Sequence, residues 1–375
     1  MKANRTLIRM SGIWKRIYSL SFLLSVAFFR KAWLVDSIKM KKQRSKGVQV
    51  DRSSIRKVWK GIKIDKGWIQ FYNSIQRENN AVFDARYIPL DIQYCFIDDW
   101  FNDTQPALLM DDKNMYDMFF FDVKKPQTVA RIVYNRFFDE NYNNLSIEQV
   151  VGRCTERKHV IFKPSIGTSG GRGILFWDVS EGQDVLLKLL SEKNNYIIQE
   201  VINQHPEISK IYPDSINSIR IVTCHYNGCT SVLSAVIRMG VNGNRLDNAS
   251  QGGLFCGIND DGSLKKYAYT KMGEAVTTHP QGAVFSECYI PNFDKCKDLV
   301  IRLSNRFLRI ARLISWDLAI GEDGEPMLIE VNLCYGGTDI HQIANGPIYG
   351  DKTKEILDKV FRQSKKYSII NKFIH

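Results

Sequence analysis

Short apolar and polar runs follow one another through most of the chain, which is typical of strands joined by turns. Strands are predicted at residues 158–163, 174–179, 195–202, 218–226 and 230–240. Residues 181–193 and 297–314 have the spacing of amphipathic helices, and residues 1–60 that of basic helices. At 375 residues, the chain is long enough for two or three packed lobes.

The most informative stretch is an apolar hairpin at residues 315–332. Its Asp323-Gly324 dipeptide favours a two-residue type I′ turn, which places Asp317 opposite Glu330. Ser315 and Asn332 then lie on the same face as these two acids. The other face holds only apolar side chains, namely Trp316, Leu318, Ile320, Met327, Ile329 and Val331. The pattern predicts two carboxylates and an amide together, on the side away from a continuous core face.

Opposed carboxylates repel each other, and a half-buried pair stays charged only if a cation compensates it. Two carboxylates and an amide oxygen suit the hard cation Mg²⁺, which keeps water and substrate phosphates in its other positions. Asp317, Glu330 and Asn332 are therefore the candidate metal ligands. The alternative is an exposed hairpin whose acids simply face water.

A glycine-rich loop follows the strand at residues 158–163. Lys163 precedes Pro164 and a loop that contains Gly167, Thr168, Ser169, Gly170, Gly171 and Gly173. Glycine lets backbone N–H groups approach a phosphate closely, and a lysine adds a point charge. The loop has no GK[ST] and no GxGxxG before a helix. By itself it is equally compatible with an ordinary turn.

The strand at residues 195–202 ends in Gln199, Glu200, Val201 and Ile202. A strand edge with free backbone N–H and C=O groups can bind adenine, and a nearby acid can bind ribose hydroxyls. An ordinary strand has the same appearance.

The composition is that of a globular protein, with 44% hydrophobic and 25% charged residues and a net charge of +12. Residues 1–66 contain 18 Lys and Arg and three Asp, a net charge of +15, which leaves −3 for the rest. No stacking motif or zinc-finger spacing accompanies the basic segment, so we expect no nucleic-acid partner. A solvated helix face, an anionic membrane surface and an acidic polymer remain as interpretations.

The eight cysteines contain no CxxC pair and the six histidines are scattered, which predicts neither a disulfide framework nor a zinc site. Reduced thiols in a cytoplasmic protein are the simpler interpretation. Residues 17–29 are apolar between basic pairs, yet too short to span a bilayer and without a cleavage site after them. We expect a buried or interfacial helix there, with a secretory signal as the alternative.

In order along the chain, these features resemble the ATP-grasp superfamily: a lysine in MDDKNMYD, FKP before a glycine loop, QEVI, and Asp followed by Glu-x-Asn. More narrowly, QEVINQHPE, NSIRIVT, GGLFCGIND, THP at 278–280 and WDLAIGEDGEPMLIEVN resemble the sugar-transfer-associated branch, which is similar to alpha-L-glutamate ligases. The resemblance covers roughly residues 111–351. It implies an α+β ATP-grasp fold, with two lobes that grip ATP. We expect a basic helical segment at 1–66, an aromatic-rich lead-in at 67–110, a smaller lobe at 111–202 and a larger lobe at 203–375.

The resemblance also implies roles for individual residues. Lys113 and Lys163 would bind the phosphates of ATP, and the loop from Gly167 to Gly173 would close over them. Gln199 to Ile202 would hold adenine, and Glu207 the ribose. Asp317, Glu330 and Asn332 would hold Mg²⁺, in agreement with the hairpin geometry.

The chain departs from the family pattern at Ser315. Relatives such as D-alanine ligases have an arginine there, two residues before the metal aspartate, to neutralise an acyl phosphate. Arg220 and Arg238 are the candidates to replace it. If Asn227-Gly228 forms a two-residue turn, Arg220 pairs with Ala235 and the two arginines lie on different faces. Without a bulge, only one of the two arginines reaches the site, and we expect it to be Arg220. For each arginine, the alternative role is a salt bridge at the surface or between the lobes.

The resemblance implies an ATP-dependent carboxylate-amine ligase that works through an acyl phosphate and needs no protein nucleophile. Its carboxylate and amine substrates are expected to be small molecules or glycan-linked groups, such as a sugar acid or an amino acid in surface polysaccharide biosynthesis. We expect a cytoplasmic protein whose basic segment contacts an anionic membrane at its inner face. The alternatives are an ATP-grasp kinase acting on a sugar and a nucleotide-responsive scaffold.

Overall fold

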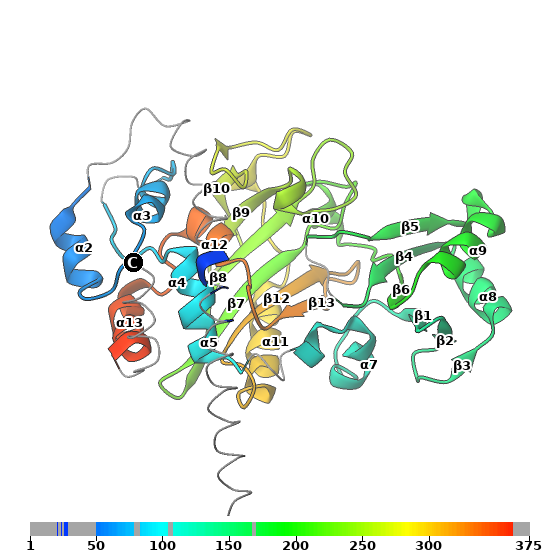
Figure 1. Ribbon diagram of the computed structural model, residues 1–375. Helices are drawn as coiled ribbons and strands as arrows, with labels where there is room; N and C mark the ends of the chain where they lie inside the picture. Colours follow the sequence, from blue (N-terminus) through cyan, green and yellow to red (C-terminus); the bar gives the residue numbers. More distant parts are fainter. Residues whose placement is uncertain are drawn as a thin grey trace, which may run out of the picture. The chain divides into compact units, whose positions relative to one another are not determined.

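The chain forms two compact units in the computed structural model (Figure 1). The structure describes residues 50–78, 83–103, 108–166 and 170–362, with a few positions between 21 and 28. One unit comprises Met1–Phe101 with Asn345–His375, and the other comprises Asn102–Ala344. Most of the apolar stretch at 17–29 and of the basic segment lies outside the described residues. The few described positions between 21 and 28 are helical.

The first unit is made of short helices. They are α2 (Arg52–Val58), α3 (Lys66–Asn73), α4 (Leu90–Ile92), a π-helical turn (Gln93–Ile97), α5 (Asp98–Phe101), a 3₁₀ turn (Gly350–Lys352) and α13 (Thr353–Arg362). Asp51 caps α2 by accepting the backbone N–H of Ser53, and Asp65 caps α3 in the same way. Trp59 and Trp68 are buried in this unit. These helices therefore enclose a small core of their own.

The second unit contains two antiparallel sheets, and the first has six strands in the order β3-β2-β1-β6-β4-β5. They are β1 (Thr128–Val133), β2 (Arg136–Phe138), β3 (Asn144–Leu145), β4 (His159–Pro164), β5 (Leu175–Asp178) and β6 (Tyr196–Glu200). Helices α8 (Ile147–Arg157) and α9 (Gln183–Glu192) lie beside this sheet (Figure 1). Their apolar faces share a core with Val160, Phe162 and Trp177 of the strands. The strands and helix predicted between residues 158 and 202 are thus confirmed.

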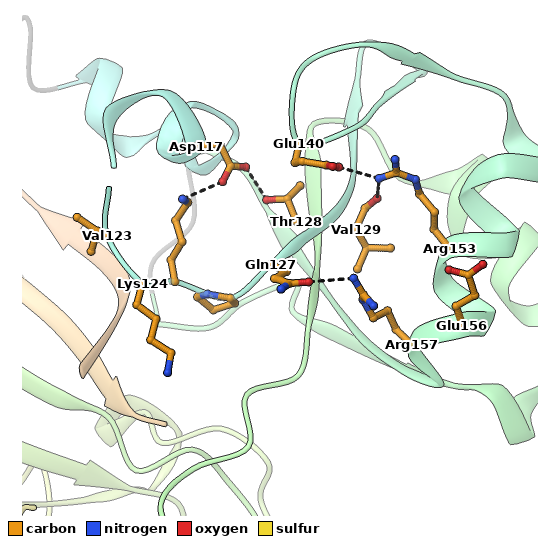
Figure 2. Close-up of a pocket in the computed structure, with 12 residues that line it drawn as sticks. Asp117, Val123, Lys124, Gln127, Thr128, Val129, Glu140, Arg153, Glu156 and Arg157 are labelled. Atoms are coloured by element: carbon orange, nitrogen blue, oxygen red, sulfur yellow. Dashed lines mark hydrogen bonds and ion pairs between the residues drawn. The ribbon is translucent and has the colours of Figure 1, made fainter. Parts of the chain in front are cut away.

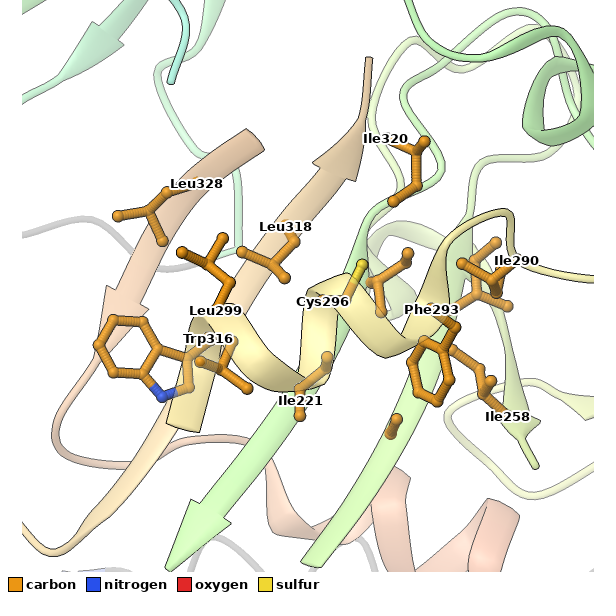
Figure 3. Packing of buried hydrophobic residues seen from close by; sticks show 14 of the residues in the cluster. Ile221, Ile258, Ile290, Phe293, Cys296, Leu299, Trp316, Leu318, Ile320 and Leu328 are labelled. Carbon is orange, nitrogen blue, oxygen red and sulfur yellow. The ribbon is translucent and has the colours of Figure 1, made fainter. Parts of the chain in front are cut away.

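The second sheet has seven strands in the order β11-β10-β9-β8-β7-β12-β13. They are β7 (Ile219–Tyr226), β8 (Cys229–Met239), β9 (Leu254–Ile258), β10 (Leu264–Tyr269), β11 (Ala275–Val276), β12 (Leu313–Ile320) and β13 (Pro326–Asn332). Helix α11 (Phe293–Arg306) covers one face of it. Figure 3 shows Trp316, Leu318 and Leu328 packed beside Cys296 and Leu299 of this helix. This sheet and its helix, with the first sheet, confirm the predicted α+β fold.

The helix predicted at residues 297–314 is shorter than expected. Helix α11 ends at Arg306, and Leu313 already belongs to β12. Phe307, Ala311 and Ile314 continue the apolar spacing because the turn and strand that follow face the same core. The remaining elements are short helices and turns: Leu108–Asp111, Lys113–Met115, α7 (Tyr116–Phe119), Val179–Glu181, α10 (Pro206–Ser209), Ala249–Gln251, Phe285–Glu287 and α12 (Thr338–Asn345).

The turn of the β12–β13 hairpin differs from the predicted type I′ turn. The N–H of Gly324 donates to the carbonyl of Gly321 at 2.8 Å, and Gly324 has a φ of 78°. The tight turn therefore spans Gly321–Gly324, with Glu322 and Asp323 at its centre. A three-residue connection with glycine in the left-handed region is the next most common hairpin solution.

This longer turn shifts the pairing by one residue, so Leu318 faces Leu328 rather than Ile329. A bulge between the Leu318–Leu328 pair and the next pair then restores the predicted register. Asp317 therefore faces Glu330, as predicted. Because side chains alternate along a strand, Leu328 lies in the core cluster in place of the predicted Met327 and Ile329. The functional end of the hairpin is as predicted, and its turn end is not.

A second bulge changes the β7–β8 hairpin. Its Asn227-Gly228 turn is confirmed, since both residues have positive φ and their neighbours Tyr226 and Cys229 pair. The register shifts by one residue between the Thr223–Val232 pair and the Val222–Ser234 pair. Arg220 therefore faces Val236 rather than Ala235. Arg238 consequently moves to the same face of the sheet as Arg220.

The four-part division of the sequence stays a prediction, and the compact units divide the chain at other points. Asn345–His375 belongs with the N-terminal unit, although the sequence grouped it with the larger lobe. Within the described ranges, no helix is both long enough and apolar enough to cross a membrane.

Candidate functional site

The larger sheet has a polar face, and the strand pairings set its side chains in two neighbouring rows across β8, β7, β12 and β13. The first row is Val236, Arg220, Asp317 and Glu330. The second row, two residues along each strand, is Ser234, Val222, Ser315 and Asn332. The intervening residues Ile221, Trp316 and Val331 belong to the core cluster. Both arginines and all three predicted metal ligands therefore share the face opposite the core.

Asp317 lies at the centre of this face and is only 1% exposed. Arg220 donates from Nε to Oδ1 at 2.7 Å and from Nη2 to Oδ2 at 2.6 Å, and Arg238 Nη2 donates to Oδ2 at 3.1 Å. Burial raises the pKa of Asp317, but the two arginines outweigh it and hold the pKa below its usual 3.8. Asp317 is therefore a carboxylate with two cationic partners.

The restriction to one arginine was expected only for a hairpin without a bulge, and that condition is not met. It assumed a regular β7–β8 hairpin, and the bulge brings Arg238 to the same carboxylate oxygen as Arg220. Ser218 and Asp247, which the sequence analysis missed, hold Arg238 in place. Its Nε donates to Ser218 Oγ at 2.9 Å, and its Nη2 lies 3.5 Å from Asp247 Oδ2.

Two lysines extend the cationic surface. Lys113 Nζ lies 2.7 Å from Glu330 Oε1, and Lys163 Nζ donates to Gln199 Oε1 at 3.1 Å. Burial, together with repulsion from Lys113, lowers the pKa of Lys163 to about 8. Four basic side chains thus lie near Asp317 and Glu330, and these clustered cationic donors can bind a polyanionic ligand.

The predicted metal ligands fit Mg²⁺ only together with phosphate groups. Asp317 and Glu330 offer carboxylate oxygens at paired positions. Asn332 Nδ2, a hydrogen-bond donor, is buried and has no partner among the described residues, which suits a contact with a phosphate oxygen. Both acids already contact cations, so a bare divalent ion would be repelled. Across the described ranges, no group of three His, Cys, Asp or Glu is arranged for a metal. This agrees with an ion that takes its other ligands from phosphates and water.

The glycine-rich loop is described only in part. Gly170, Gly171 and Gly173 have φ values of 76°, 72° and 77°, which other residues rarely adopt. Gln251 Nε2 donates to the carbonyl of Gly170 at 2.7 Å, so the loop contacts residues that precede β9. Gly167, Thr168 and Ser169 lie outside the described residues. The role of this loop over a phosphate stays a prediction.

The strand end predicted to hold adenine has few free side chains. Gln199 contacts Lys163, and Glu200 Oε1 accepts the backbone N–H of Gln127 at 3.1 Å. Val201 and Ile202 follow β6 and are partly buried. Glu207 lies in α10, where it pairs with Lys210 at 2.5 Å. No contact of these residues tests their predicted roles toward a nucleotide.

Ser315 is small because a glycine turn packs directly on it. Ser315 Oγ donates to the carbonyl of Gly336 at 2.9 Å. A Cβ atom added to Gly336 would lie 2.1 Å from Ser315 Oγ. An arginine side chain at position 315 therefore has no room. Arg220 and Arg238 supply positive charge from the neighbouring strands instead.

Replacing Gly336 by Ala is expected to destabilise the protein by about 1–3 kcal/mol, because its methyl group would overlap Ser315. Urea unfolding measures the change. Ser315→Gly in the same chain should restore most of the stability. Gly152→Ala in α8 is the control, since open space surrounds that position. An equal effect at Gly152 and Gly336 would contradict this account of Ser315.

A separate pocket of about 600 Å³ lies beside the smaller sheet. Figure 2 shows Arg153 paired with Glu140 and Asp117 in contact with Thr128, whereas no dashed line reaches Lys124 or Glu156. Asp117 also pairs with Lys125. None of the residues predicted for the site lines this pocket. We assign no function to it.

Comparisons with solved structures give matches of low sequence identity and low TM-score. The ATP-grasp ligase PsnB complexed with its minimal precursor is 14% identical, with a TM-score of 0.42, covering 69% of this chain and 64% of that one. D-alanyl-alanine synthetase A from Vibrio cholerae is 13% identical, with a TM-score of 0.38, covering 69% and 63%. The chain thus spans slightly less than two thirds of these relatives. No match was found among the curated proteins.

The match to a protein-family model is more extensive. The model described as sugar-transfer associated ATP-grasp matches residues 96–357, which include both sheets and every residue of the polar face. The family resemblance of the sequence is thereby confirmed. The chain belongs to the sugar-transfer associated ATP-grasp family.

Proposed function

We propose that the protein is an ATP-dependent carboxylate-amine ligase that activates its acid as an acyl phosphate. The carrying observation is the cluster at Asp317, where two arginines meet a carboxylate in a row that continues to Glu330. Such a face can hold a triphosphate and stabilise charge that develops when a phosphoryl group moves. Membership of an ATP-grasp family supports ATP as the nucleotide.

The nucleotide would lie with its phosphates on the polar face. Lys113 and Lys163 would contact them from the smaller lobe, and Gly170, Gly171 and Gly173 allow the loop to approach closely. Asp317, Glu330 and Asn332 would hold Mg²⁺, which supplies Lewis-acid neutralisation of the phosphate oxygens when bound. Gln199 to Ile202 and Glu207 would receive the nucleoside.

In the first step a substrate carboxylate oxygen attacks the terminal phosphorus of ATP, and the bond to ADP breaks. Arg220 and Arg238 would neutralise the acyl phosphate. They would thus take the role of the arginine that relatives have at the position of Ser315. An amine then attacks the carbonyl carbon, and phosphate leaves. The residues act by position and charge, so no side chain forms a covalent intermediate.

The acid is proposed to be a sugar acid or an amino acid, free or linked to a glycan precursor, in surface polysaccharide biosynthesis in the cytoplasm. The family description supports this class, since it associates the fold with sugar transfer. The test follows ADP and phosphate release from the full chain with panels of acids and amines. A ligase needs both substrates. Release of ADP that depends on a sugar but on no amine would identify a kinase instead.

We also propose that the basic N-terminal segment contacts anionic membranes. Deletion of residues 1–49 removes 12 of the 18 basic residues of the segment but keeps α2, whose neighbour Trp59 is buried and donates to the carbonyl of Ala85. We expect co-sedimentation with phosphatidylserine vesicles to fall at least about tenfold on deletion. Neutral vesicles are the control. Equal sedimentation of the truncated and full chains would remove the proposal.

A further inference from the structure

The smaller sheet has a second face, opposite the core that it shares with α8 and α9. Strand pairing puts Lys163 of β4 and Arg131 of β1 on this face, on either side of Ile197 in β6. The neighbours of Arg131 in β1, Ala130 and Ile132, belong to the core of the smaller sheet. Because side chains alternate along a strand, the side chain of Arg131 points away from that core. Arg131 therefore lies in the same row as a lysine that is proposed to bind ATP phosphates.

The short segment that carries Lys113 lies on this face. The Lys113–Met115 turn contacts β6. Lys113 donates its backbone N–H to the carbonyl of Ser165, directly after β4, at 2.9 Å. Tyr116 Oη accepts the backbone N–H of Val331, in β13, at 3.0 Å. The segment is thus attached to the smaller sheet at one end and to the β12–β13 hairpin at the other.

Arg131 holds the middle of this segment. Its Nε donates to the carbonyl of Asn114 at 3.1 Å. Its two Nη atoms donate to the carbonyl of Asp139 and to the carboxylate of Asp117. The side chain is 0% exposed, and its planar guanidinium group makes the three contacts in fixed directions. The backbone directly after Lys113 is therefore bound by a rigid group from β1.

A second donor reaches the same carbonyl oxygen. Tyr142 Oη donates to the carbonyl of Asn114 at 2.9 Å, and the centre of its ring lies 4.2 Å from Cζ of Arg131. Tyr142 has a φ of 64°, which residues other than glycine rarely adopt. Asp139 Oδ1 accepts two backbone N–H groups of this turn, both at 2.8 Å. Such a conformation persists only where the surrounding structure fixes it, and it is frequent near functional sites.

Stability alone does not explain a fully buried arginine. Taking charges out of water is costly, and well-packed apolar residues in place of a buried ion pair often leave a protein equally or more stable. What Arg131 and Tyr142 supply is direction, because both fix one carbonyl next to Lys113. A fixed backbone lowers the entropy cost of ordering a long side chain when a ligand binds.

We propose that Arg131 and Tyr142 are positioning residues for Lys113: they hold the backbone of its turn so that its ammonium group meets the phosphates of ATP. This inference rests on the proposed function, in which Lys113 contacts these phosphates. Lys113 Nζ lies 2.7 Å from Glu330 Oε1, so the turn places the ammonium group beside a predicted metal ligand. Arg131 itself is fully buried and would not touch the nucleotide.

Calorimetric titration of the full chain with ATP and Mg²⁺ tests this role. Tyr142→Phe removes one of the two donors to the Asn114 carbonyl and keeps the ring beside Arg131. Its Kd for ATP is expected to rise about three- to tenfold, the effect of one lost hydrogen bond. Arg131→Lys keeps a positive charge beside Asp117 but cannot reproduce three donors in fixed directions, so its Kd for ATP should rise at least about tenfold.

A double-mutant cycle with Lys113→Ala separates positioning from a general structural effect. If Arg131 and Tyr142 act through Lys113, their substitutions should change the Kd for ATP less than about twofold once that lysine is absent. A merely structural role would give the same loss in both backgrounds. Tyr349→Phe is the control, because it removes a hydroxyl hydrogen bond of 3.0 Å to Gln93 in the other compact unit. It should bind ATP as the wild type does.

The binding results also separate this role from the proposed reaction. A wild-type Kd for ATP in either variant excludes its residue from the role, and equal losses with and without Lys113 overturn the role for both. If Arg131→Lys does not fold, Tyr142→Phe decides alone. If Lys113→Ala or the wild type shows that Lys113 or the chain does not bind ATP, the positioning role fails as well. A ligase assay without amine-dependent ADP release would refute the proposed reaction and leave these binding results unchanged.

Discussion

Replacement of Glu330 by Gln is expected to reduce ligase turnover about 10²- to 10³-fold while the protein stays folded. The change keeps the shape of the side chain and removes the charge that Lys113 contacts and that the proposed Mg²⁺ would contact. Lys113 Nζ lies 2.7 Å from Glu330 Oε1, and the Glu330 side chain is 29% exposed. Lys113 is 14% exposed, but Glu330 keeps more contact with water, so we expect the loss of this pair to change the free energy of unfolding by about 1–2 kcal/mol.

The control for this change is Glu325→Gln in the same hairpin. Glu325 also pairs with a lysine, Lys295, but its side chain is more exposed and lies near the turn. Turnover is measured as ADP release in the presence of acid and amine, and unfolding is measured with urea. Wild-type turnover in Glu330→Gln would contradict the assignment of Glu330 to the metal. A similar loss in Glu325→Gln would show that the effect is not local.

Sequence reasoning predicted the centre of the site because two local rules agreed there. The alternation of apolar residues fixed which side of residues 315–332 faces the core, and the pairing of Asp317 with Glu330 followed. The position of the turn was wrong by one residue, yet the bulge after Asp317 cancelled that error. A buried apolar face specifies register strongly enough to tolerate a different turn.

The rest of the site depends on features that have no local signal. A bulge in β8 decides that Arg238 joins Arg220 at Asp317, and nothing in residues 230–240 marks it. The contact of His341 with Ser234 was not predicted, because α12 and the glycine turn before it reach the polar face only through their packing on Ser234 and Arg220. The one available sign was Gly336-Gly337, a turn signal directly after the metal hairpin.

Replacement of Asp317 by Asn is expected to abolish turnover and, unlike Glu330→Gln, to destabilise the fold by about 3–5 kcal/mol. The neutral amide would leave the buried guanidinium groups of Arg220 and Arg238 without a counter-charge, and its N–H₂ group would face their donors. The side chains of the two arginines are only 14% and 13% exposed, so water cannot replace the lost carboxylate. Urea unfolding at neutral pH measures the loss.

The control is Asp122→Asn, which removes a carboxylate that also contacts two arginines, Arg302 and Arg306, but at the surface. That change should lower the free energy of unfolding much less than Asp317→Asn does, because water surrounds the exposed carboxylate. Similar losses of stability in the two variants would contradict this account, because the cost of removing the Asp317 carboxylate would then not come from the burial of its arginine partners.

The effect of Asp317→Asn should also depend on pH in one direction. Burial raises the pKa of Asp317, but the arginines hold it below the usual 3.8, so the folded state binds this proton more weakly than the unfolded state. The carboxylate therefore stabilises the fold fully above pH 3.8, and this contribution is lost as the pH falls toward the lower folded pKa. The stability difference between wild type and Asp317→Asn should be largest at neutral pH and narrow below pH 4. A difference that stayed constant down to pH 2 would mean that the charge of Asp317 does not stabilise the two arginines.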